Sequence, residues 1–176
     1  MKHLYLRPAL PWLLLAAFIA ALDQGSKWLI TQHFAPGKAM YVSRFLNLVR
    51  AHNSGAAFSF LADAGGWQRW LFIALASGAI LLLTWLLLRH AAASRLYAAS
   101  LGLLLGGAAG NLIDRARLGY VVDFLDFHWN WLSPFFLYGH FPAFNIADAA
   151  ITVGVIGLLL NEALAIIGGF GRKRVI

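Results

Sequence analysis

Four long apolar segments constrain what this chain can fold into. They run from about Leu10 to Ile30, Trp70 to Leu88, Leu96 to Ile113 and Phe144 to Ile167. Each is close to the ~20 residues that a helix needs to cross about 30 Å of hydrocarbon. The second and third contain no charged side chain. The sequence therefore predicts a mostly α-helical membrane protein with four transmembrane helices, which form one integral-membrane domain over residues 1–176.

The overall composition agrees with a membrane environment. Hydrophobic residues make up 61% of the chain, charged residues 12%, and the mean hydropathy is +0.71, far above that of soluble domains. Cysteine is absent, which excludes disulfides, thiolate catalysis and cysteine-rich metal sites. The net charge of +7 comes from basic residues spread between apolar segments. This distribution predicts contact with membrane lipids and argues against nucleic-acid binding.

The basic residues also predict the orientation in the membrane. Seven of the fourteen Lys and Arg residues lie in the two tails and the short 89–96 loop, where the positive-inside effect operates. We therefore expect both termini in the cytoplasm and the longer connections, about 31–69 and 115–143, on the outer side. A cleaved secretory signal at the start is disfavoured, because apolar residues resume at Trp28 after the polar break.

The first outer connection has a β-prone pattern. Met40 to Val49 partly alternates between polar and apolar residues and precedes a turn signal at Asn53, Ser54 and Gly55. It predicts a small β-containing periplasmic element between the first and second helices. The second connection includes an aromatic-rich stretch, 128–141, which we expect to form a long outer loop.

Acidic side chains cluster near the outer ends of the predicted spans. Asp123 follows the third span in an apolar setting, and Asp148 lies at the start of the fourth. Because these two ends meet at the same membrane face, the carboxyl groups can approach one another. Two neighbouring carboxyl groups share a proton, so that one can activate water while the other donates a hydrogen bond. The pattern indicates an aspartic peptidase with Asp123 and Asp148 as its catalytic pair.

Structural roles compete with catalysis at several of these acids. Asn145 and Asp148 could cap the fourth helix, which would not exclude a catalytic role. Arg115 is adjacent to Asp114 and suggests a charge partnership that makes Asp114 part of the scaffold. Asp23 and Lys27 have the i,i+4 spacing of a helical ion pair.

Three other functional classes fit the sequence less well. A metallopeptidase could use His52, His128 and His140, but the sequence has no His-Glu-x-x-His pattern or comparable ligand spacing. A serine enzyme is disfavoured because Ser26 and Ser54 lack a nucleophile context. A transporter or channel usually places acids near mid-membrane or at repeated positions, whereas these acids lie near one face without an internal repeat.

Five short motifs occur together along the chain. They are Asp23, Asn53-x-Gly55-Ala56-Ala57-Phe58, Gly110-Asn111-x-x-Asp114-Arg115, Val121-Val122-Asp123-Phe124 and Phe144-Asn145-x-Ala147-Asp148. In this order they resemble the lipoprotein signal peptidases, or signal peptidase II, over nearly the whole chain. One departure is the 128–141 stretch, which looks longer than the family usually carries.

The resemblance implies a metal-independent aspartyl endopeptidase that removes signal peptides from diacylglyceryl-modified prolipoproteins, cutting before the lipidated cysteine. It implies no cofactor, prolipoproteins and membrane lipids as partners, and a site near the periplasmic face of the bacterial inner membrane. We expect a monomer. The positions that match the motifs divide into the dyad Asp123 and Asp148, and the supporting residues Asp23, Asn53, Asn111, Asp114, Arg115 and Asn145.

Overall fold

The computed structural model describes residues 3–55, 61 and 65–172. It contains four long helices: α1 (His3–His33), α2 (Gln68–His90), α3 (Arg95–Arg117) and α4 (Ile146–Arg172). Each includes a segment long and apolar enough to cross a membrane. The predicted four-helix, mostly α-helical fold is therefore confirmed. Ala56, Ala57 and Phe58 of the second motif lie outside the described residues, as do Lys173 and Arg174 of the basic tail.

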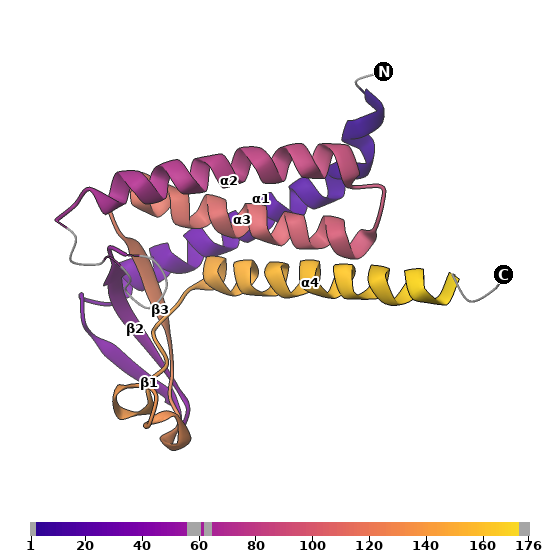
Figure 1. The fold of residues 1–176 in the computed structure, drawn as a ribbon. Helices are drawn as coiled ribbons and strands as arrows, with labels where there is room; N and C mark the ends of the chain where they lie inside the picture. The colour runs from indigo at the N-terminus through magenta and orange to yellow at the C-terminus, as the bar shows by residue number, and fades with distance from the viewer. Residues whose placement is uncertain (1–2, 56–60, 62–64, 173–176) are drawn as a thin grey trace.

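Helix α3 is the central helix, and it packs against α1, α2 and α4 (Figure 1). Its small residues permit this packing. A Cβ atom at Gly106 would lie 2.6 Å from the carbonyl oxygen of Ala16 in α1, and one at Gly107 would lie 2.5 Å from that of Ala147 in α4. Neighbouring glycines thus let two helices approach α3 from different sides, the role expected of small residues in membrane helices.

A three-stranded antiparallel sheet lies beside one end of the helices, in the order β1 (Ala39–Ser43), β2 (Leu46–Asn53) and β3 (Val121–Phe127). The first two strands form the predicted element between α1 and α2. Strand β3 comes from the connection between α3 and α4 and was not predicted. It pairs with β2, so that Ala51 lies opposite Asp123. Sheet pairing therefore brings Asn53, at the end of β2, close to the acids that follow α3.

The turn from α3 into β3 fixes where Asp123 is placed. The helix closes with hydrogen bonds from Leu118 N to Asp114 O and from Gly119 N to Arg115 O. Gly119 has a φ of +88°, a conformation that glycine adopts without the steric cost of a Cβ atom. The backbone N–H of Val122 then donates to Asp114 Oδ2 at 3.0 Å. Asp114 thus holds the start of β3 against the end of α3.

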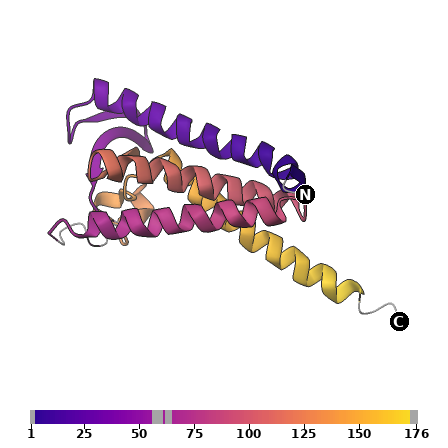
Figure 2. The same cartoon turned by 90° about the horizontal axis from the view of Figure 1, so that it is seen from above.

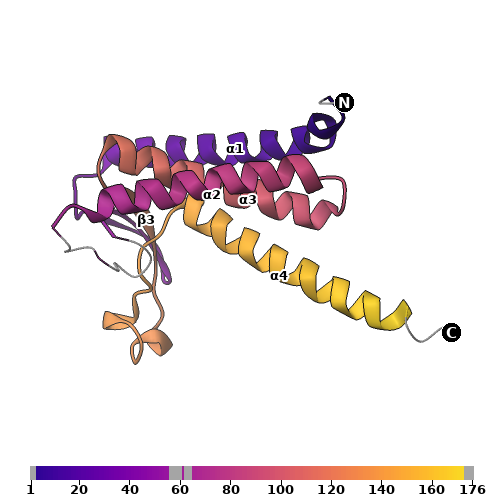
Figure 3. The ribbon, with the colours of Figure 1, turned by 45° about the horizontal axis from the view of Figure 1, so that its top comes forward.

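The 128–141 stretch forms a projection beyond the sheet (Figure 1). It contains two short 3-10 turns, η2 (Asn130–Leu132) and η3 (Leu137–Gly139). Viewed from above (Figure 2) and at an oblique angle (Figure 3), α4 diverges from the other three helices as it runs away from the sheet. Near the sheet, however, the first turn of α4 lies directly against α3, where the polar motifs meet.

Candidate active site

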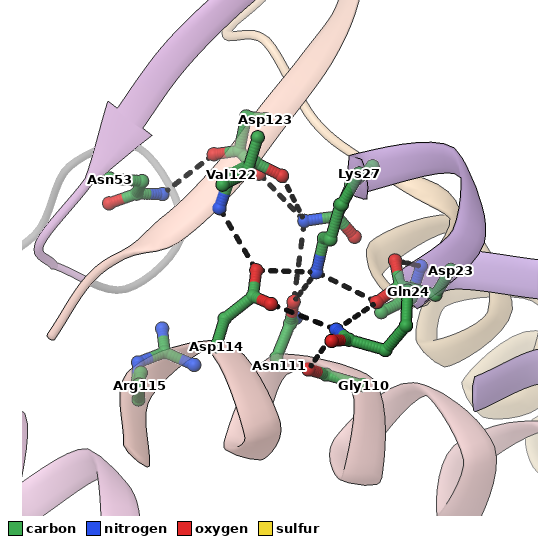
Figure 4. Close-up of polar contacts among 12 residues, drawn as sticks. Asp23, Gln24, Lys27, Asn53, Gly110, Asn111, Asp114, Arg115, Val122 and Asp123 are labelled. Atoms are coloured by element: carbon green, nitrogen blue, oxygen red, sulfur yellow. Dashed lines mark hydrogen bonds and ion pairs between the residues drawn. The ribbon is translucent and has the colours of Figure 1, made fainter. Parts of the chain in front are cut away.

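Asp123 is held on β3 by two side-chain amides. Its side chain is almost fully enclosed, with 3% exposure. Asn145 Nδ2 donates to Asp123 Oδ1 at 2.7 Å, and Asn53 Nδ2 donates to Oδ2 at 3.1 Å (Figure 4). One amide comes from the start of α4 and the other from β2. Asp123 is therefore fixed by elements that are distant in sequence.

Asp148 lies in the first turn of α4 and belongs to a reciprocal cap. The backbone N–H of Asp148 donates to Asn145 Oδ1 at 2.9 Å, while Asn145 N donates to Asp148 Oδ2 at 3.2 Å. This is the geometry of a capping box, so the predicted capping arrangement is confirmed. Asp148 Oδ1 remains available to accept from Asn111 Nδ2 at 2.8 Å. The cap therefore orients the carboxylate without using all of its acceptor capacity.

Both carboxyl groups line one cavity of about 660 Å³ between β2, α3 and the start of α4. Asn53, Asn111 and Arg115 also contribute to its wall. Much of the remaining wall is apolar: Val121, Phe141, Pro142, Ala143, Phe144, Ile151 and Val153. Such a cavity can bind a ligand that has both polar and apolar parts. The polar side chains can contact a peptide bond, and the apolar wall can contact the apolar groups of the same ligand.

The environment of Asp123 favours its protonated form. Burial, and then the charge of nearby Asp148, raise the pKa of Asp123 from 3.8 to about 7, although hydrogen bonds from Asn53 and Asn145 partly oppose this change. Removing a carboxylate from water and placing it near a second one both penalise ionisation. Near neutral pH Asp123 can therefore hold a proton beside a second carboxyl group, as one acid of a catalytic carboxyl pair must.

A buried cluster of charged side chains between α1 and α3 lies next to the carboxyl groups of the cavity. Lys27 Nζ lies 2.8 Å from Asp23 Oδ2 and 2.9 Å from Asp114 Oδ2, and it donates to Asn111 Oδ1 at 3.0 Å (Figure 4). The predicted Asp23–Lys27 pair is confirmed. Lys27 also fixes the Asn111 amide, whose Nδ2 donates to Asp148. The cluster thus connects α1 and α3 to one of the two cavity carboxylates.

Asp23 and Gln24 join α1 to α3 and α4. Asp23 Oδ1 accepts from the backbone N–H of Ala147, so it satisfies a free donor at the start of α4. Gln24 Nε2 donates to Asp114 Oδ1 at 2.8 Å and to Gly110 O at 3.1 Å. A Cβ atom at Gly110 would lie 2.5 Å from Asp23 Oδ2. The glycine is therefore needed for this carboxylate to approach α3.

Comparisons with known proteins agree with this arrangement. Residues 15–164 match the family profile described as signal peptidase (SPase) II. The chain belongs to the signal peptidase II family. A lipoprotein signal peptidase of Burkholderia vietnamiensis is 50% identical over 153 residues, covering 86% of this chain and 87% of that protein. One from Ralstonia nicotianae is 49% identical over 152 residues, covering 86% and 83%.

Solved structures show the same fold. A bacterial membrane enzyme superposes with a TM-score of 0.76 at 29% identity, covering 94% of this chain and 93% of the other. A second has a TM-score of 0.71 at 31% identity, with 86% and 92% coverage. This chain is thus a multi-pass membrane protein of a peptidase family, and the transporter or channel alternative is not supported.

One predicted partnership in this signal peptidase II chain is wrong. Asp114 forms its ion pair with Lys27, whereas the sequence suggested its neighbour Arg115. Successive helical residues point in different directions, so Arg115 faces the cavity and donates from Nη2 to Gly55 O at 2.8 Å. Its buried Nε–H has no hydrogen-bond partner among the described residues. Arg115 therefore offers an unused donor close to the carboxyl groups.

Of the residues considered for the competing enzyme classes, His52 lines the same cavity as the two carboxyl groups, whereas His128, His140 and Ser26 do not. His52 stacks on Tyr120 with ring centroids 4.0 Å apart, whereas His128 and His140 lie together in the outer projection. Ser26 Oγ donates to the backbone oxygen of Asp23 at 2.8 Å, as a structural helix serine does. The three histidines of the metallopeptidase hypothesis are therefore not brought to one centre.

The structure adds two residues to those expected from the motifs. Lys27 was assigned only to a pair within α1, and Gln24 was not singled out. The signal for both is their i,i+3 or i,i+4 position relative to other polar residues on a transmembrane helix, where uncompensated polar groups are costly. Their main partners lie on α3, which spacing within α1 does not indicate.

Proposed function

We propose that this chain removes signal peptides from diacylglyceryl-modified prolipoproteins by cutting before the lipidated cysteine. Its family membership supports the class of activity. The observation that supports an aspartic mechanism is the placement of Asp123 and Asp148 in one partly apolar cavity, with the pKa of Asp123 raised to about 7. The activity uses water and two carboxyl groups and requires no cofactor.

The chemistry follows from the different environments of the two acids. Asp148 accepts hydrogen bonds from Asn111 and from a backbone N–H at the N-terminus of α4, where the helix dipole favours negative charge. It is the general base that takes a proton from water as the water oxygen attacks the scissile carbonyl. Protonated Asp123 donates its proton to the carbonyl oxygen, forming a neutral tetrahedral intermediate.

Collapse of this intermediate breaks the carbon–nitrogen bond. Asp148 returns its proton to the leaving nitrogen, which becomes the amino group of the lipidated cysteine. Asp123 recovers a proton from a hydroxyl group as the new carboxyl group forms. Each carboxyl group thus ends the cycle in its starting protonation state.

Asn53 and Arg115 position the substrate backbone. Both line the cavity, and Arg115 has an N–H donor without a described partner.

The supporting residues hold this pair in place. Asn145 contacts both acids, while Asn111 connects Asp148 to Lys27. Asp23 and Asp114 flank Lys27 and also anchor the starts of α4 and β3. We assign Asn145, Asn111, Asp23, Asp114 and Lys27 to positioning. We also propose that the protein acts as a monomer, in which one chain supplies both carboxyl groups and their supporting residues.

The proposed orientation in the membrane rests on the basic residues of the tails and the 89–96 loop, which favour cytoplasmic termini. The beginning of α1 and the end of α4 lie at the end of the helices away from the sheet (Figure 1). With cytoplasmic termini, the sheet and cavity lie at the periplasmic face of the bacterial inner membrane. We also propose that residues 1–176 act as a single domain, since α1, α3, α4, β2 and β3 all contribute to the polar network.

Lipidation of the substrate should strongly affect cleavage. Each buried methylene contributes about 0.8 kcal/mol, so two acyl chains can supply a large part of substrate binding. We expect purified protein in micelles to cut a diacylglyceryl-modified precursor, releasing a fragment that begins with the modified cysteine, and to cut the unlipidated precursor far more slowly. Mass spectrometry of the products measures both. Equal kcat/KM for the two precursors would contradict the proposed substrate class.

The raised pKa of Asp123 predicts how cleavage depends on pH. Below about pH 7 the acid is mostly protonated and can donate; above that value the protonated fraction falls. We therefore expect kcat/KM to decrease as pH rises from about 6 to about 9, approaching tenfold per unit at the alkaline end. Initial rates on a lipidated precursor without titratable groups near the scissile bond measure this. A flat profile over the range would exclude protonated Asp123 as the acid.

A further inference from the structure

A second cluster of polar side chains lies outside the proposed catalytic cavity, at the base of the 128–141 projection. It consists of Asp126 near the end of β3, His128 just after that strand and His140 just after η3. His128 and His140 face each other across an isolated antiparallel bridge, and their rings stack with centroids 4.8 Å apart. One donor atom from each of the three residues lies within 4.8 Å of the other two.

We propose that Asp126, His128 and His140 bind a divalent transition-metal ion, with zinc as the ion that best fits the donors. Two imidazoles and one carboxylate are typical zinc ligands, and tetrahedral zinc with bonds of ~2.0 Å places its ligand atoms about 3.3 Å apart. Nδ1 of His140 already lies 2.8 Å and 2.9 Å from the two Asp126 oxygens. Coordination would draw His128 toward this pair, since the three donor atoms lie within 4.8 Å of one another, and water would take the fourth position.

The hydrogen bonding around the cluster supports a metal site. His128 Nδ1 is buried and has no hydrogen-bond partner among the described residues, an arrangement that is costly unless a ligand completes it. Asp126 is 8% exposed and accepts from Asn47 Nδ2 at 3.1 Å. Asn47 is thus the kind of outer partner that orients a coordinating carboxylate. Asp126 is thus already oriented for coordination, and His128 has a ring nitrogen without a hydrogen-bond partner among the described residues.

The position of the cluster indicates a structural role for the ion. His128 and His140 stand at the two ends of the projection, whose outer residues include the exposed Trp131, Phe135, Leu137 and Tyr138. The next residue, Phe141, lines the proposed catalytic cavity. A metal ion would therefore cross-link the base of the projection and fix the adjoining cavity wall.

The proposed ion is separate from peptide hydrolysis. Asp123 and Asp126 are three residues apart on β3, so their side chains point to opposite faces and lie about 10 Å apart along the strand. In agreement, Asp123 lines the cavity and Asp126 is not among its lining residues. The metal proposal thus does not depend on the aspartic mechanism, and EDTA is expected to leave cleavage of a lipidated precursor intact.

Zinc titration of the purified full chain tests the site directly. The affinity tag is removed, the protein is treated with EDTA and dialysed, and zinc chloride is titrated by calorimetry in detergent. We expect one zinc ion per chain, loss of this binding in His128→Ala and Asp126→Asn, and weakening by about tenfold in Asn47→Ala. His33→Ala is the matched control, because His33 lies on α1 and its Nδ1 contacts the backbone oxygen of Leu29 in the same helix. Absence of zinc binding, or equal binding by wild type and His128→Ala, overturns the proposal.

Thermal unfolding separates lost coordination from lost folding. Zinc should raise the unfolding temperature of wild type and His33→Ala but leave that of His128→Ala unchanged, while all three unfold cooperatively in EDTA. If His128→Ala does not fold, the milder His128→Gln replaces it in both measurements. An equal zinc-induced shift in the His128 variant overturns the site. Loss of cleavage in EDTA, restored by zinc, would place the ion in catalysis and contradict the structural role.

Discussion

Asp123→Asn and Asp148→Asn are each expected to lose cleavage of a lipidated precursor by at least a hundredfold and up to ~10⁴-fold, the range that acid–base groups contribute. Asparagine retains the size of aspartate but cannot supply or take up the required proton. Rates under saturating precursor, measured by mass spectrometry, show the loss. Asp114→Asn is the control, since Asp114 accepts from Val122 N and pairs with Lys27 in the supporting cluster.

The Asp123 variant should lose this activity while remaining folded. Because burial and Asp148 raise the folded-state pKa of Asp123 above 3.8, the carboxyl group stabilises the fold most at low pH. That contribution is lost as pH rises toward about 7. A neutral asparagine avoids ionisation beside Asp148, so the unfolding temperature at mildly alkaline pH should not fall below that of wild type. Near-normal turnover by Asp123→Asn or Asp148→Asn would refute the assignment of these two acids as the catalytic pair.

Lys27→Met is expected to have the largest effect on stability. Lys27 is 3% exposed and lies between Asp23 and Asp114. Its removal leaves two buried carboxyl groups without their cation, and breaking a buried ion pair costs about 3–5 kcal/mol. Asp114→Asn should cost less, because it leaves the Lys27–Asp23 pair in place. Thermal unfolding in one detergent compares the variants, with exposed Lys38→Met as the control.

A double variant distinguishes the charge effect from lost packing. Adding Asp114→Asn to Lys27→Met removes one of the two uncompensated carboxyl groups. The double variant should therefore be less destabilised than the sum of the two single variants, which is the coupling expected of residues in contact. If Lys27→Met unfolds at the same temperature as Lys38→Met, the buried cluster does not stabilise the fold.

The sequence predicted those features that depend on local pattern. The four helices were found because apolar segments of about 20 residues with few charged side chains have few alternatives to crossing a membrane. Strand β3 was missed because Val121 to Phe124 are all buried, which removes the polar–apolar alternation that identifies a strand. Short apolar runs of this kind do not distinguish buried strand from other structure.

Contacts between distant segments could be predicted only in part. The order of the spans was enough to bring Asp123 and Asp148 to the same membrane face. It did not show that Lys27 rather than Arg115 pairs with Asp114, because this depends on how α1 is rotated against α3. The sequence also grouped His128 and His140 with His52 and did not indicate that Asp126 joins them, since it contains no regular ligand spacing. The loop fold between positions 128 and 140 creates that cluster.

The central claim is that Asp123 performs the chemistry whereas Asp114 supports the fold. The most direct measurement compares Asp123→Asn and Asp114→Asn on the same diacylglyceryl-modified precursor, with bound precursor and cleaved product quantified in the same folded fraction. We expect Asp123→Asn to bind the precursor without cutting it, and Asp114→Asn to unfold at a lower temperature yet retain measurable turnover. A stable but inactive Asp114→Asn beside an Asp123→Asn that cleaves would reverse the two assignments.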